Sequence, residues 1–179
     1  MKNDIVLIID FGSQVTQLIA RRLRELKVYC EIYPFNKINN PLLKEINPKA
    51  IILSGGPASV LDAYAPKPPS KIFELGIPIL GICYGQQIMV KMLGGKVTSG
   101  HGTAEFGKSF VKIKKKNIKI LENLFLDNQD EEVWMSHEDH VSKIPKSFDV
   151  YAESENAPFA IIGNEEKNLY AVQFHPEVV

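Results

Sequence analysis

Short apolar runs alternate with amphipathic segments along the first half of the chain, and this alternation restricts the possible folds more than any other feature. The apolar runs at residues 5–9, 50–53 and 77–82 have the length of strands, and each ends in a polar or glycine-rich loop. Residues 14–26 place apolar side chains at helical spacing between the first two runs. The pattern predicts an α/β fold, an open mostly parallel sheet with helices on both faces.

Residues 28–33 are expected to form a further strand, and residues 41–46, 70–75 and 86–93 to be helical, which completes the alternation. The second half of the chain follows a different pattern. From about residue 95 onward, short strand-like pieces are separated by polar turns; they span residues 96–98, 108–114, 132–136, 148–152, 160–163 and 169–174. We interpret them as added antiparallel strands in the C-terminal half of one domain that covers residues 1–179.

Composition excludes several classes of function. The 21 basic and 21 acidic side chains cancel, so no overall field attracts nucleic acid or an anionic membrane. The basic run at residues 112–119 lacks interleaved aromatic residues, and we interpret it as the solvated end of a hairpin. The apolar run at residues 5–9 is too short for a membrane span or a secretory signal. We therefore expect a cytoplasmic protein with a small-molecule ligand.

The two cysteines, Cys30 and Cys83, have different sequence contexts. Cys30 lies within a strand-like run and is interpreted as a core residue. Cys83 lies between Gly81 and Gly85, after an apolar strand and before a helical run, which is the context of a nucleophile elbow. A helix N-terminus favours the thiolate, so Cys83 is predicted to be an exposed, activated nucleophile. The motif alone also allows a packed core cysteine.

A candidate base lies near the end of the chain, where His175 and Glu177 follow the strand-like run at residues 169–174. In an extended backbone, residues two apart project to the same side, so Glu177 is expected to contact the His175 ring. A carboxylate on one ring nitrogen would leave the other to take a proton from a thiol. Taken alone, the pair favours a surface histidine beside an acid, since a triad is recognised by geometry and not by spacing.

Other motifs indicate an oxyanion hole rather than a metal or phosphate site. The SGGP loop at residues 54–57 is a plausible source of a free backbone N–H, and the amide of Tyr84 is the second. The loop lacks both the P-loop ending and GxGxxG spacing, so phosphate binding is not favoured. His137 and His140 are not in an HExxH motif and have no evident third ligand, so no metal site is predicted.

Taken together, these segments resemble class I (triad) glutamine amidotransferases, which have a flavodoxin-like fold and hydrolyse L-glutamine to glutamate and ammonia. The motifs that carry the resemblance span almost the whole chain: residues 8–25, SGGPASV, GICYGQQ, EFG at 105–107, VWMSH and VQFHPEV. The resemblance implies that Cys83 is the nucleophile and that His175 and Glu177 complete the triad. It also implies that the amides of Gly56 and Tyr84 form the oxyanion hole.

The same resemblance carries expectations about substrate and partner. Gln87, Ser136 and His137 would contact the glutamine substrate. More narrowly, the same six motifs resemble the branch of the family whose ammonia aminates XMP to GMP. The implied partner is an ATP-pyrophosphatase synthetase domain or subunit, which would bind ATP and Mg²⁺. No cofactor is expected within residues 1–179, which we interpret as part of a longer chain.

Two alternatives remain open from the sequence. One is the amidotransferase domain of another biosynthetic pathway. The other is a catalytically silent regulatory domain of the same fold, which is suggested by Glu138, because the family usually has glycine at this position in an SHGD segment. A negative side chain there is expected to crowd the glutamine pocket or repel the substrate carboxylate.

Overall fold

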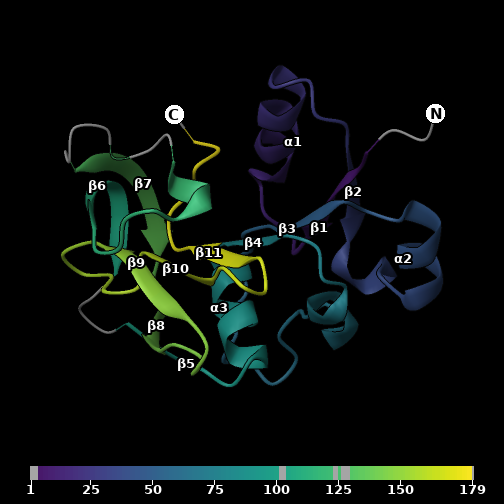
Figure 1. The fold of residues 1–179 in the computed structure, drawn as a ribbon. Helices are drawn as coiled ribbons and strands as arrows, with labels where there is room; N and C mark the ends of the chain where they lie inside the picture. The colour runs from purple at the N-terminus through teal and green to yellow at the C-terminus, as the bar shows by residue number, and fades with distance from the viewer. Residues whose placement is uncertain (1–3, 101–103, 123–124, 126–129, 179) are drawn as a thin grey trace.

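Nine strands form the central sheet of the computed structural model, which describes residues 4–100, 104–122, 125 and 130–178 (Figure 1). In spatial order they are β2 (Cys30–Pro34), β1 (Val6–Asp10), β3 (Ala50–Leu53), β4 (Ile79–Ile82), β11 (Leu169–Val172), β10 (Ile161–Asn164), β9 (Asp149–Glu153), β6 (Glu105–Ile113) and β7 (Glu131–His137). Neighbours from β2 to β11 are parallel, and neighbours from β11 to β7 are antiparallel. The predicted fold class is confirmed, including the antiparallel strands of the C-terminal half.

Helices cover both faces of the parallel part of the sheet. Figure 1 shows α1 (Thr16–Glu25) above the central strands and α3 (Tyr84–Met92) below them. Ile8 of β1 packs in the core cluster that includes α1, whereas Leu7 packs in the cluster that includes α3 and α2 (Asn40–Ile46). Because β1 is buried on both faces, its sequence is a continuous apolar run rather than an alternating one.

Some elements differ from the predictions. Helix α3 begins directly after Cys83, two residues earlier than expected, and residues 70–75 form a 3₁₀ helix, η2 (Ser70–Glu74). The sequence pattern missed β8 (His140–Lys143), which pairs with β5 (Lys96–Thr98) in a separate two-stranded sheet. Its four residues contain a single apolar side chain, so no alternation marks it as a strand. Two further 3₁₀ turns are η1 (Phe35–Lys37) and η3 (Lys119–Leu121).

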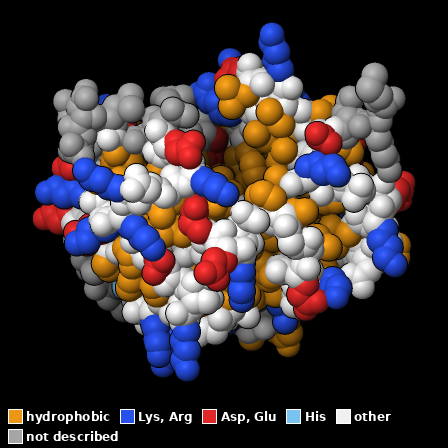
Figure 2. Space-filling view, in the orientation of Figure 1, with side chains coloured by type: hydrophobic (Ala, Val, Ile, Leu, Met, Phe, Trp, Pro, Cys, Tyr) orange, Lys and Arg blue, Asp and Glu red, His pale blue; other side chains and the backbone are white. Residues whose placement is uncertain are grey.

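The basic run after β6 is partly neutralised by acidic side chains of β9. Lys114 Nζ lies 3.0 Å from Glu153 Oε1, and Lys115 Nζ lies 2.6 Å from Asp149 Oδ2. Figure 2 shows basic and acidic side chains interspersed on the face in view, without a large area of one sign. No helix among the described residues is both long and apolar enough to cross a lipid bilayer.

The register between β4 and β11 places two distant parts of the chain side by side. Ile82 pairs with Val172, and the N–H of Cys83 donates to the Val172 carbonyl at 2.9 Å. Both strands are parallel, so the loops that follow them leave the sheet at the same edge. The thiol of Cys83 and the segment that contains His175 therefore meet there.

Close approach of α3 to β3 gives a first prediction. A Cβ on Gly85 would lie 2.2 Å from the Leu53 carbonyl oxygen. Alanine is the better helix former by about 1 kcal/mol. However, no rotamer change relieves an overlap with backbone, so we expect Gly85→Ala to lower the free energy of unfolding by about 3 kcal/mol.

Gly76→Ala is the matched control, because a Cβ there meets no atom within 4 Å and incurs only the strain of a φ of +69°. That strain is worth about 1 kcal/mol. Urea unfolding compares the two variants. A Gly85→Ala variant as stable as Gly76→Ala would contradict the close approach of α3 to β3.

Candidate active site

Cys83 occupies a strained turn between β4 and α3. Its φ of 51° and ψ of −105° are unusual for a residue with a side chain, and such strain is typical of a nucleophile elbow. The flanking glycines permit the turn, because a Cβ on Gly81 would lie 2.6 Å from the carbonyl oxygen of Gly85. The predicted elbow is thus present as a strand-to-helix turn.

The Cys83 side chain is less accessible than its sequence context suggests. We expected an exposed sulfur, and this is wrong: only 7% of the residue is exposed, because neighbouring loops cover the elbow. Cys83 nevertheless lines two cavities, of about 340 Å³ and about 310 Å³. Its Sγ lies 3.5 Å from the Ser136 carbonyl oxygen and 3.7 Å from Gln173 Nε2. The residue therefore borders two cavities although most of its surface is covered.

His175 and Glu177 form the predicted pair, with 2.9 Å between Nδ1 and Oε1, and both residues are buried. The extended backbone expected for this segment is wrong. The Val178 N–H donates to the His175 carbonyl, which closes a turn with Pro176 in its second position. A turn rather than a strand therefore brings the carboxylate to the ring, and the fixed φ of proline favours it.

The electrostatics of the pair favour a charged imidazole. Burial by itself lowers the pKa of His175, because it disfavours the charged form. Hydrogen bonds with Cys83 and Glu177, together with the negative charges of both groups, outweigh burial and raise the pKa to about 10. An imidazolium beside the sulfur stabilises the thiolate, which is the nucleophilic form of cysteine.

The SGGP loop lies between the triad and the loop after β1. A Cβ on Gly55 would lie 2.9 Å from His175 Cε1, and one on Gly56 would lie 2.9 Å from the Phe11 carbonyl oxygen. Gly56 lines both cavities, and Tyr84 is the first residue of α3, where N–H groups lack a partner within the helix. Both predicted oxyanion donors are thus close to the sulfur; their role remains a prediction.

The predicted glutamine-contacting residues, Gln87, Ser136 and His137, all line the cavity of about 340 Å³. Gln87 Nε2 donates to the Asp139 carbonyl at 2.7 Å, so this amide holds the cavity wall in place. The ring of His137 is buried against Glu105 and the Asp139 carbonyl. The His137 side chain is therefore engaged within the protein rather than free for a ligand.

Glu138 lies at the edge of the same cavity with its side chain exposed. Its φ is not positive, so the backbone accepts a side chain at this position without strain. The expectation that this carboxylate hinders glutamine binding stays a prediction.

Two residues of the site were missed in the sequence. Gln173 donates from Nε2 to Cys83 Sγ and accepts from Gln87 Nε2 at 3.4 Å, so it connects the elbow with the cavity wall. Its signal was its place in the VQFHPE segment, two residues before His175. Asp139 accepts a hydrogen bond from the Ser59 hydroxyl, and only the tertiary structure brings these two residues together.

The remaining cysteine and histidine have other surroundings. Cys30 is buried, and its Sγ lies 3.7 Å from the Ala20 carbonyl oxygen, as expected of a core thiol. His140 Nε2 lies 3.3 Å from Thr98 Oγ1. The described part of the chain contains no group of three or more His, Cys, Asp or Glu side chains placed to hold a metal ion.

A thiol, an imidazole and a carboxylate at the carboxyl ends of parallel strands are the arrangement of a cysteine-dependent acyl-transfer site. Residues 7–179 match the family described as glutamine amidotransferase class-I. The chain belongs to this family.

Curated relatives of high identity are named GMP synthase [glutamine-hydrolyzing]. The chain is 61% identical over 176 residues to the protein of Dinoroseobacter shibae, covering 98% of this chain and 34% of that protein. It is 56% identical over 176 residues to the protein of Sinorhizobium fredii, covering 98% and 33%. The chain thus spans about a third of the length of these relatives.

Solved structures with the same fold include a protein of Thermoplasma acidophilum that is provisionally assigned as one of the subunits of a GMP synthase. It has a TM-score of 0.79 and 28% identity, over 99% of this chain and 86% of that one. A glutamine amidotransferase of Thermotoga maritima has a TM-score of 0.75 and 22% identity, over 99% and 77%. At that identity, the second likeness supports the fold alone.

The raised pKa of His175 predicts a pH dependence of stability. The folded protein holds a proton on this ring that the unfolded chain releases above its ordinary pKa of 6.5. The associated stability is therefore fully present below pH 6.5 and is lost as the pH rises to about 10. Glu177→Gln removes one cause of the raised pKa. We expect the unfolding free energy of the wild type to fall more steeply across this interval than that of Glu177→Gln, as measured by urea unfolding.

Glu74→Gln is the control for this measurement, because Glu74 is an exposed carboxylate paired with Lys71. Its pH profile should match that of the wild type. Parallel profiles for the wild type and Glu177→Gln would show that Glu177 does not set the pKa of His175.

Proposed function

We propose that the chain hydrolyses L-glutamine to glutamate and ammonia, with Cys83 as nucleophile. The observation that carries this proposal is that a strained elbow thiol and His175 line the same cavity of about 310 Å³, with His175 Nδ1 2.9 Å from Glu177 Oε1. The buried carboxylate orients the ring and stabilises its charged form, so that the ring can stabilise a thiolate and later supply a proton.

The acylation step follows from this arrangement. The Cys83 thiolate attacks the side-chain amide carbon of glutamine, a C–S bond forms, and the carbonyl oxygen becomes an oxyanion. The N–H groups of Gly56 and Tyr84 would donate to that oxygen. The His175 imidazolium gives its proton to the amide nitrogen, the C–N bond breaks, and ammonia leaves a glutamyl thioester on Cys83.

Hydrolysis of the thioester restores the site. The neutral His175 takes a proton from water as the water oxygen attacks the thioester carbon. The C–S bond breaks, glutamate is released, and the thiolate and imidazolium form again. The cavity of about 340 Å³ would hold the glutamyl group, and water would reach Cys83 through the cavity of about 310 Å³, which Cys83 also lines.

The ammonia would serve the amination of XMP to GMP. Support comes from the curated relatives, which are named GMP synthase and are 56% and 61% identical over 98% of this chain. The partner would be an ATP-pyrophosphatase synthetase domain or subunit. ATP and Mg²⁺ would bind in that partner, with no cofactor in residues 1–179, and a cytoplasmic location is part of the same proposal.

Removal of the nucleophile tests the hydrolysis. Cys83→Ala and His175→Ala should each lower glutamate release by about 10⁴-fold, because each lacks a group that bonds or transfers a proton. Cys30→Ala should retain activity within about twofold, since Cys30 only packs in the core. A coupled glutamate assay measures all three variants. Undiminished release by Cys83→Ala would refute the mechanism.

The nitrogen source tests the link to XMP. In the polypeptide that includes the synthetase part, Cys83→Ala should abolish GMP formation from glutamine and leave GMP formation from ammonium salts within about twofold of the wild type. The two rates are measured with ATP, Mg²⁺ and XMP. Absence of ATP-dependent GMP formation from ammonium in the wild type would argue for another amination pathway.

A further inference from the structure

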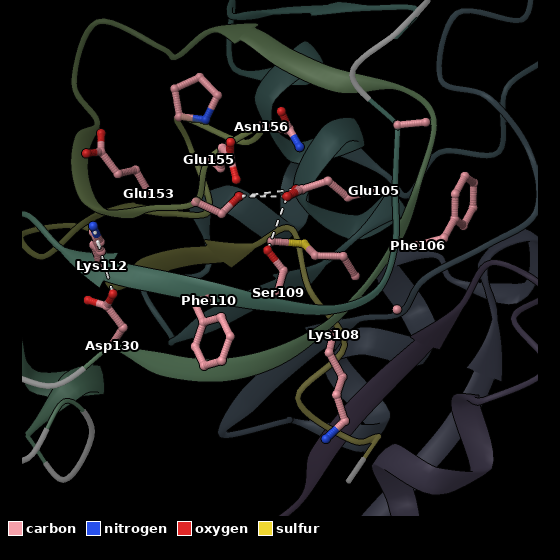
Figure 3. Close-up of a pocket in the computed structure, with 15 residues that line it drawn as sticks. Glu105, Phe106, Lys108, Ser109, Phe110, Lys112, Asp130, Glu153, Glu155 and Asn156 are labelled. Atoms are coloured by element: carbon pink, nitrogen blue, oxygen red, sulfur yellow. Dashed lines mark hydrogen bonds and ion pairs between the residues drawn. The ribbon is translucent and has the colours of Figure 1, made fainter.

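The cavity of about 340 Å³ that would hold glutamine is called the glutamine cavity here. A buried carboxylate, Glu105, lies behind its wall and takes no part in the mechanism above. It is the first residue of β6 and pairs directly with His137 of β7. Only 8% of it is exposed, and its Oε1 accepts from Ser109 Oγ at 3.2 Å. Figure 3 shows Glu105 pointing toward Ser109 beside a cavity of about 900 Å³, whose lining includes none of the three triad residues.

The carboxylate joins three segments of the chain. Ser154 Oγ lies 3.2 Å from Glu105 Oε1 and 3.1 Å from Oε2, and it also accepts from the Ala157 N–H at 3.0 Å. On the other side, Glu105 Oε2 lies 3.2 Å from His137 Nε2. A buried carboxylate is costly unless such partners surround it, so these contacts hold β6, β7 and the turn at residues 154–157 in one arrangement.

The His137 ring carries this constraint into the cavity wall. Its Nδ1 lies 3.1 Å from the Asp139 carbonyl oxygen, while its Nε2 faces Glu105. Both ring nitrogens thus face oxygen atoms of neighbouring residues. The ring is held from two sides, which fixes the turn between β7 and β8.

That turn contacts the nucleophile Cys83 and the Gln87 side chain of the cavity wall. The Asp139 carbonyl also accepts from Gln87 Nε2, and Ser136, next to His137, places its carbonyl oxygen 3.5 Å from Cys83 Sγ. Residues 136–139 all line the glutamine cavity. A shift of His137 would therefore move the cavity wall, although Glu105 itself does not touch the sulfur.

We propose that Glu105 is a positioning residue for glutamine: through His137 it holds residues 136–139 in the geometry that receives the substrate. This inference rests on the proposed glutaminase function. It goes beyond a contribution to stability, because the loss of Glu105 should impair reactions that use the glutamine cavity and spare the intrinsic reactivity of the Cys83 thiol.

Two electrophiles separate these effects in the full chain. 6-Diazo-5-oxo-L-norleucine has the shape of glutamine and uses the cavity, whereas iodoacetamide needs only an accessible thiolate. Glu105→Ala should slow labelling of Cys83 by the first reagent about tenfold and by the second less than about twofold. Glu105→Gln retains an acceptor oxygen, so this variant should slow labelling by the glutamine analogue only about threefold. Mass spectrometry of the Cys83 peptide measures each rate.

Glu132→Ala is the matched control, because Glu132 is a half-exposed carboxylate of β7 paired with Lys108 on the same two strands. Its labelling by both reagents should stay within about twofold of the wild type.

In the glutaminase assay, Glu105→Ala should raise KM about tenfold and leave kcat within about threefold. His137→Ala should do the same, and the double variant should show no further loss, since the two residues act in series.

The outcomes separate the two proposals. Equal slowing with both electrophiles, or additive effects in the double variant, would overturn the positioning role while leaving glutamine hydrolysis intact. So would labelling and KM of both Glu105 variants equal to those of the wild type. A wild type that iodoacetamide labels but the glutamine analogue does not would refute the glutaminase function, and the positioning role with it.

Discussion

The parallel pairing of β4 with β11 is the constraint on which the site depends. It joins Ile82 to Val172 and lets the Cys83 N–H bond to the Val172 carbonyl, so that residues ninety positions apart begin their loops at one edge. Without this pairing, neither the elbow nor the turn at His175 would have a partner. Parallel strands require long crossovers, and here the crossover includes most of the antiparallel half of the chain.

Close backbone packing then brings the groups of the candidate site together at this edge. Gly55, Gly56 and Gly85 let a loop and a helix approach neighbouring atoms more closely than any Cβ allows. The strained backbone at Cys83 persists because the surrounding strand and helix determine it. Burial of the His175–Glu177 pair then strengthens its electrostatic effect on the sulfur, because a buried ion pair is poorly screened by solvent.

The antiparallel strands do more than extend the sheet. The Trp134 carbonyl of β7 accepts from the His175 N–H, and the Ser136 carbonyl lies against the thiol. Glu105 and His137 fix the end of β7 from behind. Cys83 and His175 thus follow strands of the parallel half, whereas residues 136–139 of the cavity wall come from the antiparallel half, so the candidate site requires both parts of the domain.

The sequence by itself determined the parallel core, the elbow at Cys83 and the association of His175 with Glu177, because apolar periodicity, glycine spacing and a proline act locally. It did not reveal β8, whose pairing depends on a distant strand. Likewise, the burial of Cys83 and the hydrogen bonds of Gln173 join residues far apart in sequence. Only the tertiary structure decided these features, because long-range packing leaves no periodic signal in the chain.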